Sequence, residues 1–200
     1  HALCEMGKTH HLAGSFDQAE YTYQSAISYA ERIPRPAVRA RVALELGELH
    51  TTQAVIPPMS TLALQAKESH LQEAYRWLKE AHQIAGESGY DIYSIRALAG
   101  LAELAVEEHM LSEARDRCLD AIKQAEQTLR ERSSREVQLT AAIAWRALGM
   151  TLAKEPVQRN QINIGTKPIS ANSCFYRSEK LLHDLGNGCS HELAKTWRAW

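Results

Sequence analysis

The stretch that decides the fold is Trp145-Arg146-Ala147-Leu148-Gly149, in which two large residues stand three apart and a glycine follows the second. Residues three and four apart share one face of a helix, so Trp145, Leu148 and Gly149 form a single surface there. A glycine inside a helix costs about 1 kcal/mol relative to alanine. It is tolerated where a second helix must come close, because glycine has no side chain to hold two backbones apart. The stretch therefore predicts a helix that a second helix crosses closely.

A matching pattern for the second helix recurs along the chain: a small residue, a large residue four later, and a small residue three after that. Four segments carry it, namely Ala19-Tyr23-Ala26, Ala74-Leu78-Ala81, Ala114-Cys118-Ala121 and Ala171-Phe175-Ser178. A first-helix pattern precedes each of them, namely Leu3-Met6-Gly7, Leu46-Gly47, Leu98-Leu101-Ala102 and Trp145-Leu148-Gly149. The regular alternation of the two patterns predicts repeated helix pairs, whereas a single match would be expected by chance in an alanine-rich chain.

These paired patterns resemble the tetratricopeptide repeat (TPR) family over nearly the whole chain. The resemblance implies an all-α fold, a solenoid of antiparallel helix pairs that forms a right-handed superhelix. The implied repeats span approximately residues 1–36, 37–91, 92–132 and 133–189, with a partial repeat at 190–200. The long repeats are similar to those of multidomain bacterial signalling ATPases and large transcriptional activators. The family pattern is broken at Ala102, Cys118 and Ser178, and an ordinary helical bundle with alanine-rich seams is the alternative.

Composition narrows the function classes. Hydrophobic residues make up 44% and charged residues 24% of the chain, which is typical of a folded protein and not of a disordered one. Lys and Arg total 23 against 24 for Asp and Glu, a net charge of -1, so we expect no nucleic-acid or anionic-membrane partner. The longest nearly uncharged run, Ala97 to Ala102, is too short to cross a bilayer.

Local signals favour helices with short interruptions. Capping-box spacing predicts three helix starts, at Ser15 with Gln18, Ser69 with Gln72, and Ser133 with Glu136. The one segment with strand-like alternation is Gln161 to Gly165.

The sequence begins with His1 and stops at Trp200, so we expect a piece of a longer protein. The four cysteines have no paired spacing, which favours a reducing, cytoplasmic location.

The TPR resemblance also implies a concave groove, lined by first-helix residues next to the packing positions. The residues at those positions are Cys4, Lys8, His11, Arg41, Leu44, Glu48, Arg96, Glu103, Val106, Glu107, Ile143, Arg146, Met150 and Lys154, with Lys195 and Arg198 extending the series. The candidates for partner binding are Lys8, His11, Arg41, Glu48, Arg96, Glu103, Glu107, Arg146, Met150 and Lys154. This mixed set suits a peptide or amphipathic helix that carries both charges.

Arginine is the most useful residue type in this set, because its planar fork can hold a carboxylate through two hydrogen bonds. The alternative for Arg96 is an ion pair with Glu103 or Glu107 on its own helix. Chaperone-binding TPR members grip a carboxylate with paired Lys and Asn. The matching Asn positions here hold Lys8, Glu48, Glu103 and Met150, and glutamate would repel that ligand, so this role is disfavoured.

Two insertions interrupt the helix pairs, Thr51 to Glu68 and Ala153 to Asn172. Insertions on one edge of a solenoid often form a binding face, so either insertion is a candidate contact with a partner or a neighbouring domain. The alternative is a tolerated surface loop, because lengthening a loop costs little entropy.

The sequence contains no recognisable catalytic or metal-binding motif. Its nine histidines do not form H-E-x-x-H, and Cys189 beside His191 fits a capped helix start better than a nucleophile. We therefore expect no enzymatic activity and no cofactor. The predicted function is a protein-interaction scaffold, or a sensor arm of a larger cytoplasmic signalling or transcription-regulating protein. The alternatives are a module that responds to a small molecule or short peptide, and self-association through Trp197 and Trp200.

Overall fold

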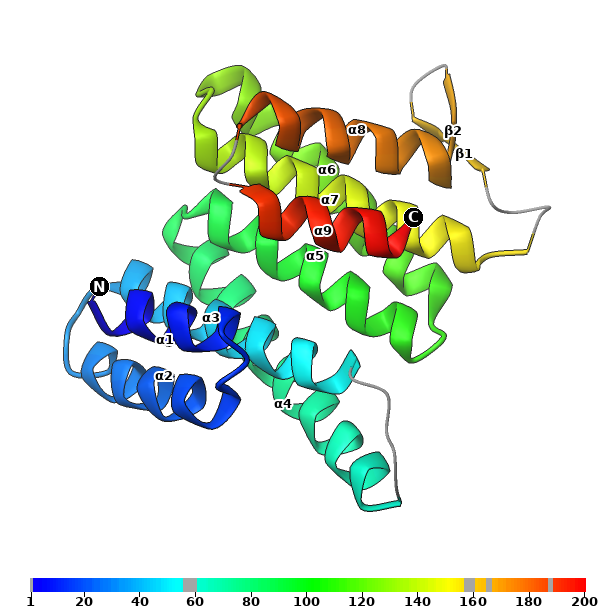
Figure 1. The fold of residues 1–200 in the computed structure, drawn as a ribbon. Coiled ribbons are helices and arrows are strands. Elements are labelled where there is room, and N and C mark those ends of the chain that lie inside the picture. Colours follow the sequence, from blue (N-terminus) through cyan, green and yellow to red (C-terminus); the bar gives the residue numbers. More distant parts are fainter. Residues whose placement is uncertain (1, 56–60, 157–160, 165–166, 187–188) are drawn as a thin grey trace. The chain divides into compact units, whose positions relative to one another are not determined.

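The computed structural model describes residues 2–55, 61–156, 161–164, 167–186 and 189–200, and these residues are predominantly helical. The elements are α1 (Ala2–Leu12), α2 (Phe16–Ala30), α3 (Pro36–Val55), α4 (Thr61–Ser88), α5 (Asp91–Glu107), α6 (Leu111–Glu131), α7 (Arg135–Lys154), β1 (Gln161–Ile164), β2 (Lys167–Ser170), α8 (Ala171–Asp184) and α9 (Ser190–Ala199) (Figure 1). The chain divides into two compact units, residues 1–100 (unit 1) and 101–200 (unit 2). The predicted all-α class is confirmed.

The helix starts agree only in part with the predicted caps. Ser15 precedes α2, but its side chain makes no capping hydrogen bond. The cap of α7 is Ser134 and not Ser133, because the Ser134 side chain is the one that accepts a hydrogen bond from the Val137 amide, at 3.3 Å. Ser69 lies inside α4 and starts no helix. The Leu, Ala, Gln and Lys residues before it favour helix strongly enough to carry α4 back to Thr61.

Close packing in unit 1 follows the small-and-large pattern. Helix α1 packs on α2, and α3 packs on α4. A Cβ atom placed on Gly7 would lie 2.5 Å from the Tyr23 ring, and one placed on Gly47 would lie 2.6 Å from Leu78 Cγ. Tyr23 and Leu78 are fully buried, as are Ala19 and Ala74 beside them. The glycines therefore sit where the helices cross, as the sequence predicts.

The same arrangement recurs in unit 2, where α7 packs on both α6 and α8. A Cβ atom on Gly149 would lie 2.8 Å from the Phe175 ring, which is buried. Ala114, Cys118 and Ala121 of α6 are buried as well. Ser178, which departs from the family pattern, places its hydroxyl 3.3 Å from that of Thr196 on α9. A buried hydroxyl thus finds its partner in a neighbouring buried hydroxyl.

The first insertion is largely helical. Its first residues, 51–55, complete α3, and its last residues, 61–68, form the first turns of α4; residues 56–60 lie outside the described residues. The predicted bounds of this insertion, Thr51 to Glu68, are therefore too wide, because residues at both of its ends belong to the two helices. The cause is again the run of helix-favouring residues before Ser69.

The second insertion contains a β-hairpin. Strands β1 and β2 pair antiparallel, with Gln161 opposite Ser170 and Ile162 opposite Ile169. Ile169 is buried, whereas Gln161 and Asn163 are exposed, so the alternation seen in the sequence is real. The segment noted for its strand-like alternation, Gln161 to Gly165, thus contributes strand β1 over Gln161–Ile164. Residues 153–154 belong to α7 and residues 171–172 to α8.

Candidate functional site

In unit 1, the candidate arginines bind glutamates that lie on other helices. Arg41 of α3 forms an ion pair with Glu5 of α1. Arg96 of α5 places Nη2 2.5 Å from Glu48 Oε1 on α3. Each pair joins two consecutive first helices of the predicted repeats. Arg96 therefore has an interhelical partner, a possibility that the sequence analysis did not raise.

A buried carboxylate lies beside these pairs. Glu45 of α3 is only 3% exposed and accepts a hydrogen bond of 3.3 Å from the Tyr23 hydroxyl on α2. Burial raises the pKa of Glu45 above its ordinary value, and the negative charge of Glu48 raises it further. Arg96, Lys8 and Arg41 act in the opposite direction. Burial and the neighbouring Glu45 likewise raise the pKa of the Tyr23 phenol, which keeps the phenol protonated as the donor.

In unit 2, one arginine binds two glutamates. Arg146 of α7 is 4% exposed and forms ion pairs with Glu103 of α5, at 3.1 Å from Nη2, and with Glu192 of α9. Burial alone would lower the pKa of this guanidinium, but Glu192 and Glu103 together raise it above its ordinary value. The guanidinium fork that could have held a partner's carboxylate already holds two from its own chain.

The ten candidates differ in how accessible they are. Lys8 and Lys154 are exposed, Arg146 is buried, and the others are half-buried: His11, Arg41, Glu48, Arg96, Glu103, Glu107 and Met150. His11 Nε2 lies 3.0 Å from the Thr52 hydroxyl on α3. The TPR resemblance also places four small or apolar residues in the groove. All four are buried in their units: Cys4, Leu44, Val106 and Ile143. They form core and do not line a surface.

Sequence reasoning missed the acidic partners Glu5 and Glu192, and it also missed Glu45. Glu5 is separated from Arg41 by 36 residues, and Glu192 from Arg146 by 46. Their positions relative to the packing residues of the first helices would have pointed to them, because each ion pair joins an arginine of one first helix to a glutamate of a neighbouring first helix. The family groove positions do not include these acids, since they are defined on each repeat separately and take no account of charges on the neighbouring repeat.

A further buried ion pair lies where the second insertion leaves α7. Glu155 follows the last residue of α7, and its side chain is 2% exposed. Its Oε1 atom accepts a hydrogen bond of 2.9 Å from Arg115 Nε on α6. This contact fixes one end of the hairpin-containing segment to the helical core of unit 2.

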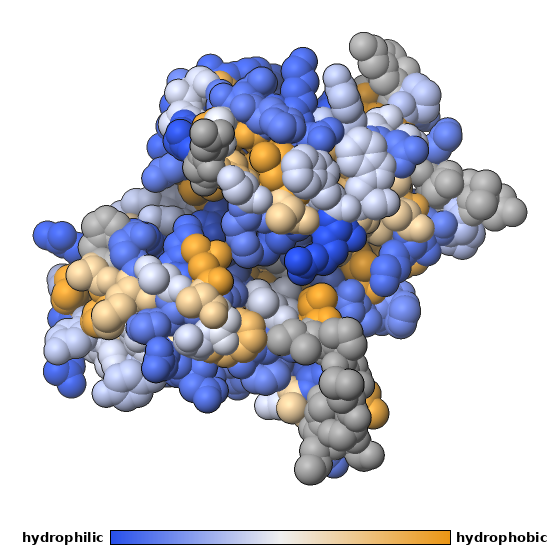
Figure 2. Space-filling model, viewed as in Figure 1, coloured by the Kyte–Doolittle hydropathy of each residue, from blue (hydrophilic) through white to orange (hydrophobic). Residues whose placement is uncertain are grey.

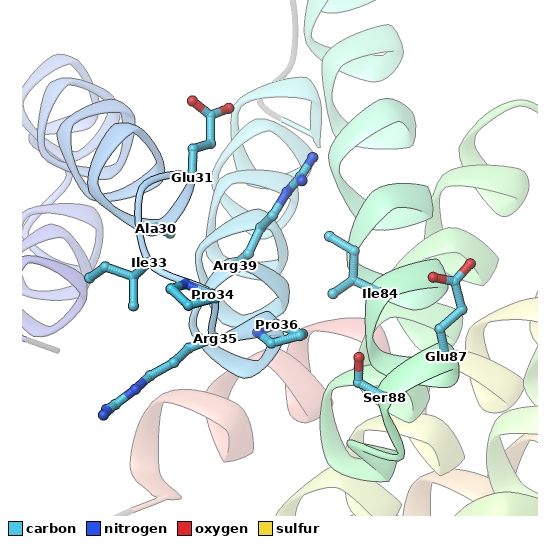
Figure 3. Close-up of a pocket in the computed structure, with 10 residues that line it drawn as sticks. All are labelled: Ala30, Glu31, Ile33, Pro34, Arg35, Pro36, Arg39, Ile84, Glu87 and Ser88. Atoms are coloured by element: carbon cyan, nitrogen blue, oxygen red, sulfur yellow. The ribbon is translucent and has the colours of Figure 1, made fainter.

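A surface cavity of about 370 Å³ lies in unit 1, between the α2–α3 turn and the C-terminal end of α4 (Figure 3). Ile33, Pro34 and Ile84 give it apolar walls, and Arg39 and Glu87 are among its charged residues. Arg39 also binds Glu80 of α4, at 2.7 Å. None of the ten candidate residues lines this cavity. Its volume is at the low end of the range for small-molecule sites.

The part of the chain that the structure describes gives little sign of side chains that could bind a metal ion or act as a nucleophilic thiol. Its His, Cys, Asp and Glu side chains form no group of three or more that could hold a metal ion. All four cysteines are buried, and burial raises the pKa of the Cys118 and Cys174 thiols to about 12. A thiol with so high a pKa is a poor nucleophile at neutral pH. Cys189, which stands two residues before His191 in the sequence, is 4% exposed.

The molecular surface and the helix lengths bear on the kind of partner. On the face shown in Figure 2, hydrophobic residues occur in small groups among hydrophilic ones. Among the helices that the structure describes, none combines the length and the apolar character that a membrane span needs.

No model of a known protein family matches the chain. A search of curated proteins likewise found no match.

Proposed function

We propose that this chain is a TPR-like α-solenoid that serves as a protein-interaction scaffold or regulatory arm of a larger cytoplasmic signalling or transcription-regulating protein. The observation that supports the proposal best is one packing register in three helix pairs. Gly7 lies against Tyr23, Gly47 against Leu78, and Gly149 against Phe175. Stacked repeats require such recurrence, because each pair must present the same surface to the next. An irregular helical bundle has no need for the same contact to recur from one helix pair to the next.

The face of the first helices is the proposed binding surface within each unit. Its arginines are held by the chain's own glutamates, so the helices that carry the surface are fixed before a partner arrives. Such preorganisation lowers the entropic cost of binding. The exposed Lys8 and Lys154 and the half-buried Met150 are the side chains available for direct contact. A peptide with acidic groups next to apolar ones fits this chemistry.

The solenoid is tested by small-angle X-ray scattering on the 200-residue chain. A compact domain of this length has a radius of gyration of about 16–17 Å. A superhelix of stacked helix pairs gives a clearly larger value and an extended distance distribution. A compact value would contradict the solenoid and favour the helical bundle.

The binding surface is tested with peptides selected from a random display library on the wild-type protein. Lys154→Glu reverses an exposed charge on α7, and Lys123→Glu reverses an exposed charge on the second helix α6 as the matched control. We expect Lys154→Glu to weaken peptide binding about tenfold, equivalent to about 1.4 kcal/mol, and Lys123→Glu to leave it unchanged. Equal effects would exclude the first-helix face as the binding surface.

The alternative function is a module that responds to a small molecule, and the cavity at the α2–α3 turn is the observation that favours it. A library of small charged metabolites screened by thermal unfolding tests this alternative. A ligand present at 100 times its Kd stabilises the folded state by about 2.7 kcal/mol. Loss of that stabilisation in Ile84→Glu, which puts a charge into the apolar wall, would assign the ligand to the cavity.

A further inference from the structure

Two histidines of unit 1 face each other across the α3–α4 interface. His50 lies in the C-terminal third of α3 and is 3% exposed, and His70 lies in the N-terminal half of α4 and is half-buried. Their Nδ1 atoms are 3.2 Å apart, while the ring centroids are 5.5 Å apart. Because the two nitrogens are much closer than the two ring centres, the Nδ1 atoms point toward each other.

The chemistry of imidazole limits what this contact can hold. A neutral imidazole has one nitrogen that donates and one that accepts. The contact between the two Nδ1 atoms is therefore a hydrogen bond only when one of them carries a proton and the other does not. If both rings are charged, both Nδ1 atoms carry protons, and two N–H groups and two positive charges then oppose each other. The pair accommodates one proton between its facing nitrogens and excludes a second.

The surroundings of His50 also oppose its protonation. Burial is the strongest influence and lowers the pKa of His50 below its ordinary value of 6.5. His70 and Arg76 of α4 lower it further, while Glu20 of α2 and Glu73 of α4 raise it. Glu73 and Arg76 form an ion pair at 2.5 Å, so their opposing charges lie close together.

The location of the pair determines what its opening would change. Helices α3 and α4 run side by side, and the first turns of α4 extend beyond the end of α3 (Figure 1). Leu64, Gln65 and Ala66 in those turns are exposed. The crossing of Gly47 and Leu78 holds the two helices together deeper in unit 1. The histidine pair lies between this crossing and the extended turns.

We propose that His50 and His70 form a proton-operated latch, which is closed near neutral pH and released when mild acidification charges both rings, so that both facing Nδ1 atoms carry a proton. Release loosens the C-terminal end of α3 from the first half of α4 and leaves the Gly47–Leu78 crossing in place. The latch does not depend on the proposed function. Since the pKa of His50 is lowered in the folded state, its contribution to stability is complete above pH 6.5 and is lost as the pH falls below that value.

The first experiment measures the thermal unfolding midpoint of the 200-residue chain between about pH 7.5 and about pH 5.5. The test variant is His50→Asn/His70→Asn, because an asparagine amide occupies nearly the position of Nδ1 and does not titrate. The matched control is His82→Asn, since His82 Nδ1 lies 3.0 Å from the Ser94 hydroxyl, which can accept from a charged ring. We expect the wild type and His82→Asn to lose about 3 °C or more on acidification, and the double variant to lose markedly less. An equal loss in all three proteins would overturn the latch.

A second experiment needs no variant and locates the proton. Two-bond hydrogen–nitrogen NMR correlations of the wild type at about pH 7.5 should show one of the two rings protonated at Nδ1 and the other unprotonated there. Amide exchange, corrected for its intrinsic pH dependence, should increase on acidification at the end of α3 and the start of α4. Protonation of both rings at Nε2 alone would overturn the proposal. A rise of the neutral-pH midpoint with Zn²⁺, absent from the double variant, would also overturn it and assign the pair to metal binding.

Discussion

In each unit a first helix of the predicted repeats buries a charged side chain beside its interhelical ion pairs, namely Glu45 of α3 in unit 1 and Arg146 of α7 in unit 2. Glu45 is 3% exposed and Arg146 is 4% exposed. Glu45 receives a hydrogen bond of 3.3 Å from a tyrosine hydroxyl, whereas Arg146 binds two carboxylates. The difference follows from their chemistry. A buried carboxylate can lose its charge by taking up a proton, but a guanidinium remains charged at any pH that proteins tolerate and must be paired.

The largest expected effect comes from breaking the pairing in unit 2. Arg146→Met retains much of the side-chain volume and removes the buried cation that Glu103 and Glu192 share, whereas Glu192 keeps its contact with Lys195 at 3.3 Å. We therefore expect a loss toward the lower end of about 3–5 kcal/mol in the free energy of unfolding. In unit 1, Arg41→Met should cost about 0–1 kcal/mol, because its partner Glu5 is 56% exposed. Urea unfolding at neutral pH measures both. Equal losses would mean that burial does not determine the strength of these pairs.

The glycine contacts test whether the two units share one packing register. Gly47→Ala would bring a methyl group to 2.6 Å from Leu78 Cγ and 3.2 Å from the Leu78 backbone nitrogen, and Gly149→Ala would bring one to 2.8 Å from Phe175. We expect both to lose stability within a range of about 1–3 kcal/mol, with Gly47→Ala the more severe because backbone cannot move aside.

Gly86 provides the matched control for these substitutions. It lies inside α4, and a Cβ atom placed on it meets nothing within 4 Å. Gly86→Ala should therefore raise stability by up to about 1 kcal/mol, because alanine favours helix. Thermal and urea unfolding should agree in sign. A stabilising effect at Gly47 or Gly149 would contradict the close crossings on which the repeat register depends.

A smaller loss is expected at Ala114, which lies in a buried cluster with Ala105 and Val106 in unit 2. Ala114→Leu should overpack this cluster and cost stability in the lower part of the range of about 1–3 kcal/mol. The cost is limited because the neighbouring Leu111 is only half-buried and can move. Ala153→Leu, at an exposed position of α7, is the control and should change the unfolding midpoint little. Equal midpoints in both variants would count against the register of the third helix pair.

The sequence predicted packing better than it predicted charge contacts, and the reason is geometric. Gly149 and Phe175 each follow from the local spacing of small and large residues on one helix, which a sequence displays directly. The contact between Arg146 and Glu192 depends instead on the angle and separation of two helices, and no local spacing encodes these. The facing of His50 and His70 has the same origin. It depends on how far α4 extends back toward Thr61. The capping-box spacing at Ser69 predicted that this helix would begin later than it does.

The smallest expected effect is a change in how stability depends on pH, and it tests Glu45, the buried acid of unit 1. Since the pKa of Glu45 is raised in the folded state, the folded protein binds this proton more tightly than the unfolded chain does. The stability that Glu45 contributes is thus present at low pH and is lost as the pH rises above the ordinary value of 4.5. Glu45→Gln, which keeps an oxygen to accept from Tyr23, removes this loss.

The stability of Glu45→Gln relative to the wild type should therefore increase as the pH rises from 4.5 toward neutrality. Urea unfolding at several pH values in this interval measures the difference, which is independent of any constant cost of burying the amide. The histidine latch acts equally in both proteins and cancels from the comparison. A pH-independent difference would mean that Glu45 has the same pKa in the folded and unfolded chain, because Arg96, Lys8 and Arg41 offset the burial of its charge. In that case the acid and the base would be stabilised by the same principle, and proton uptake would play no part in unit 1.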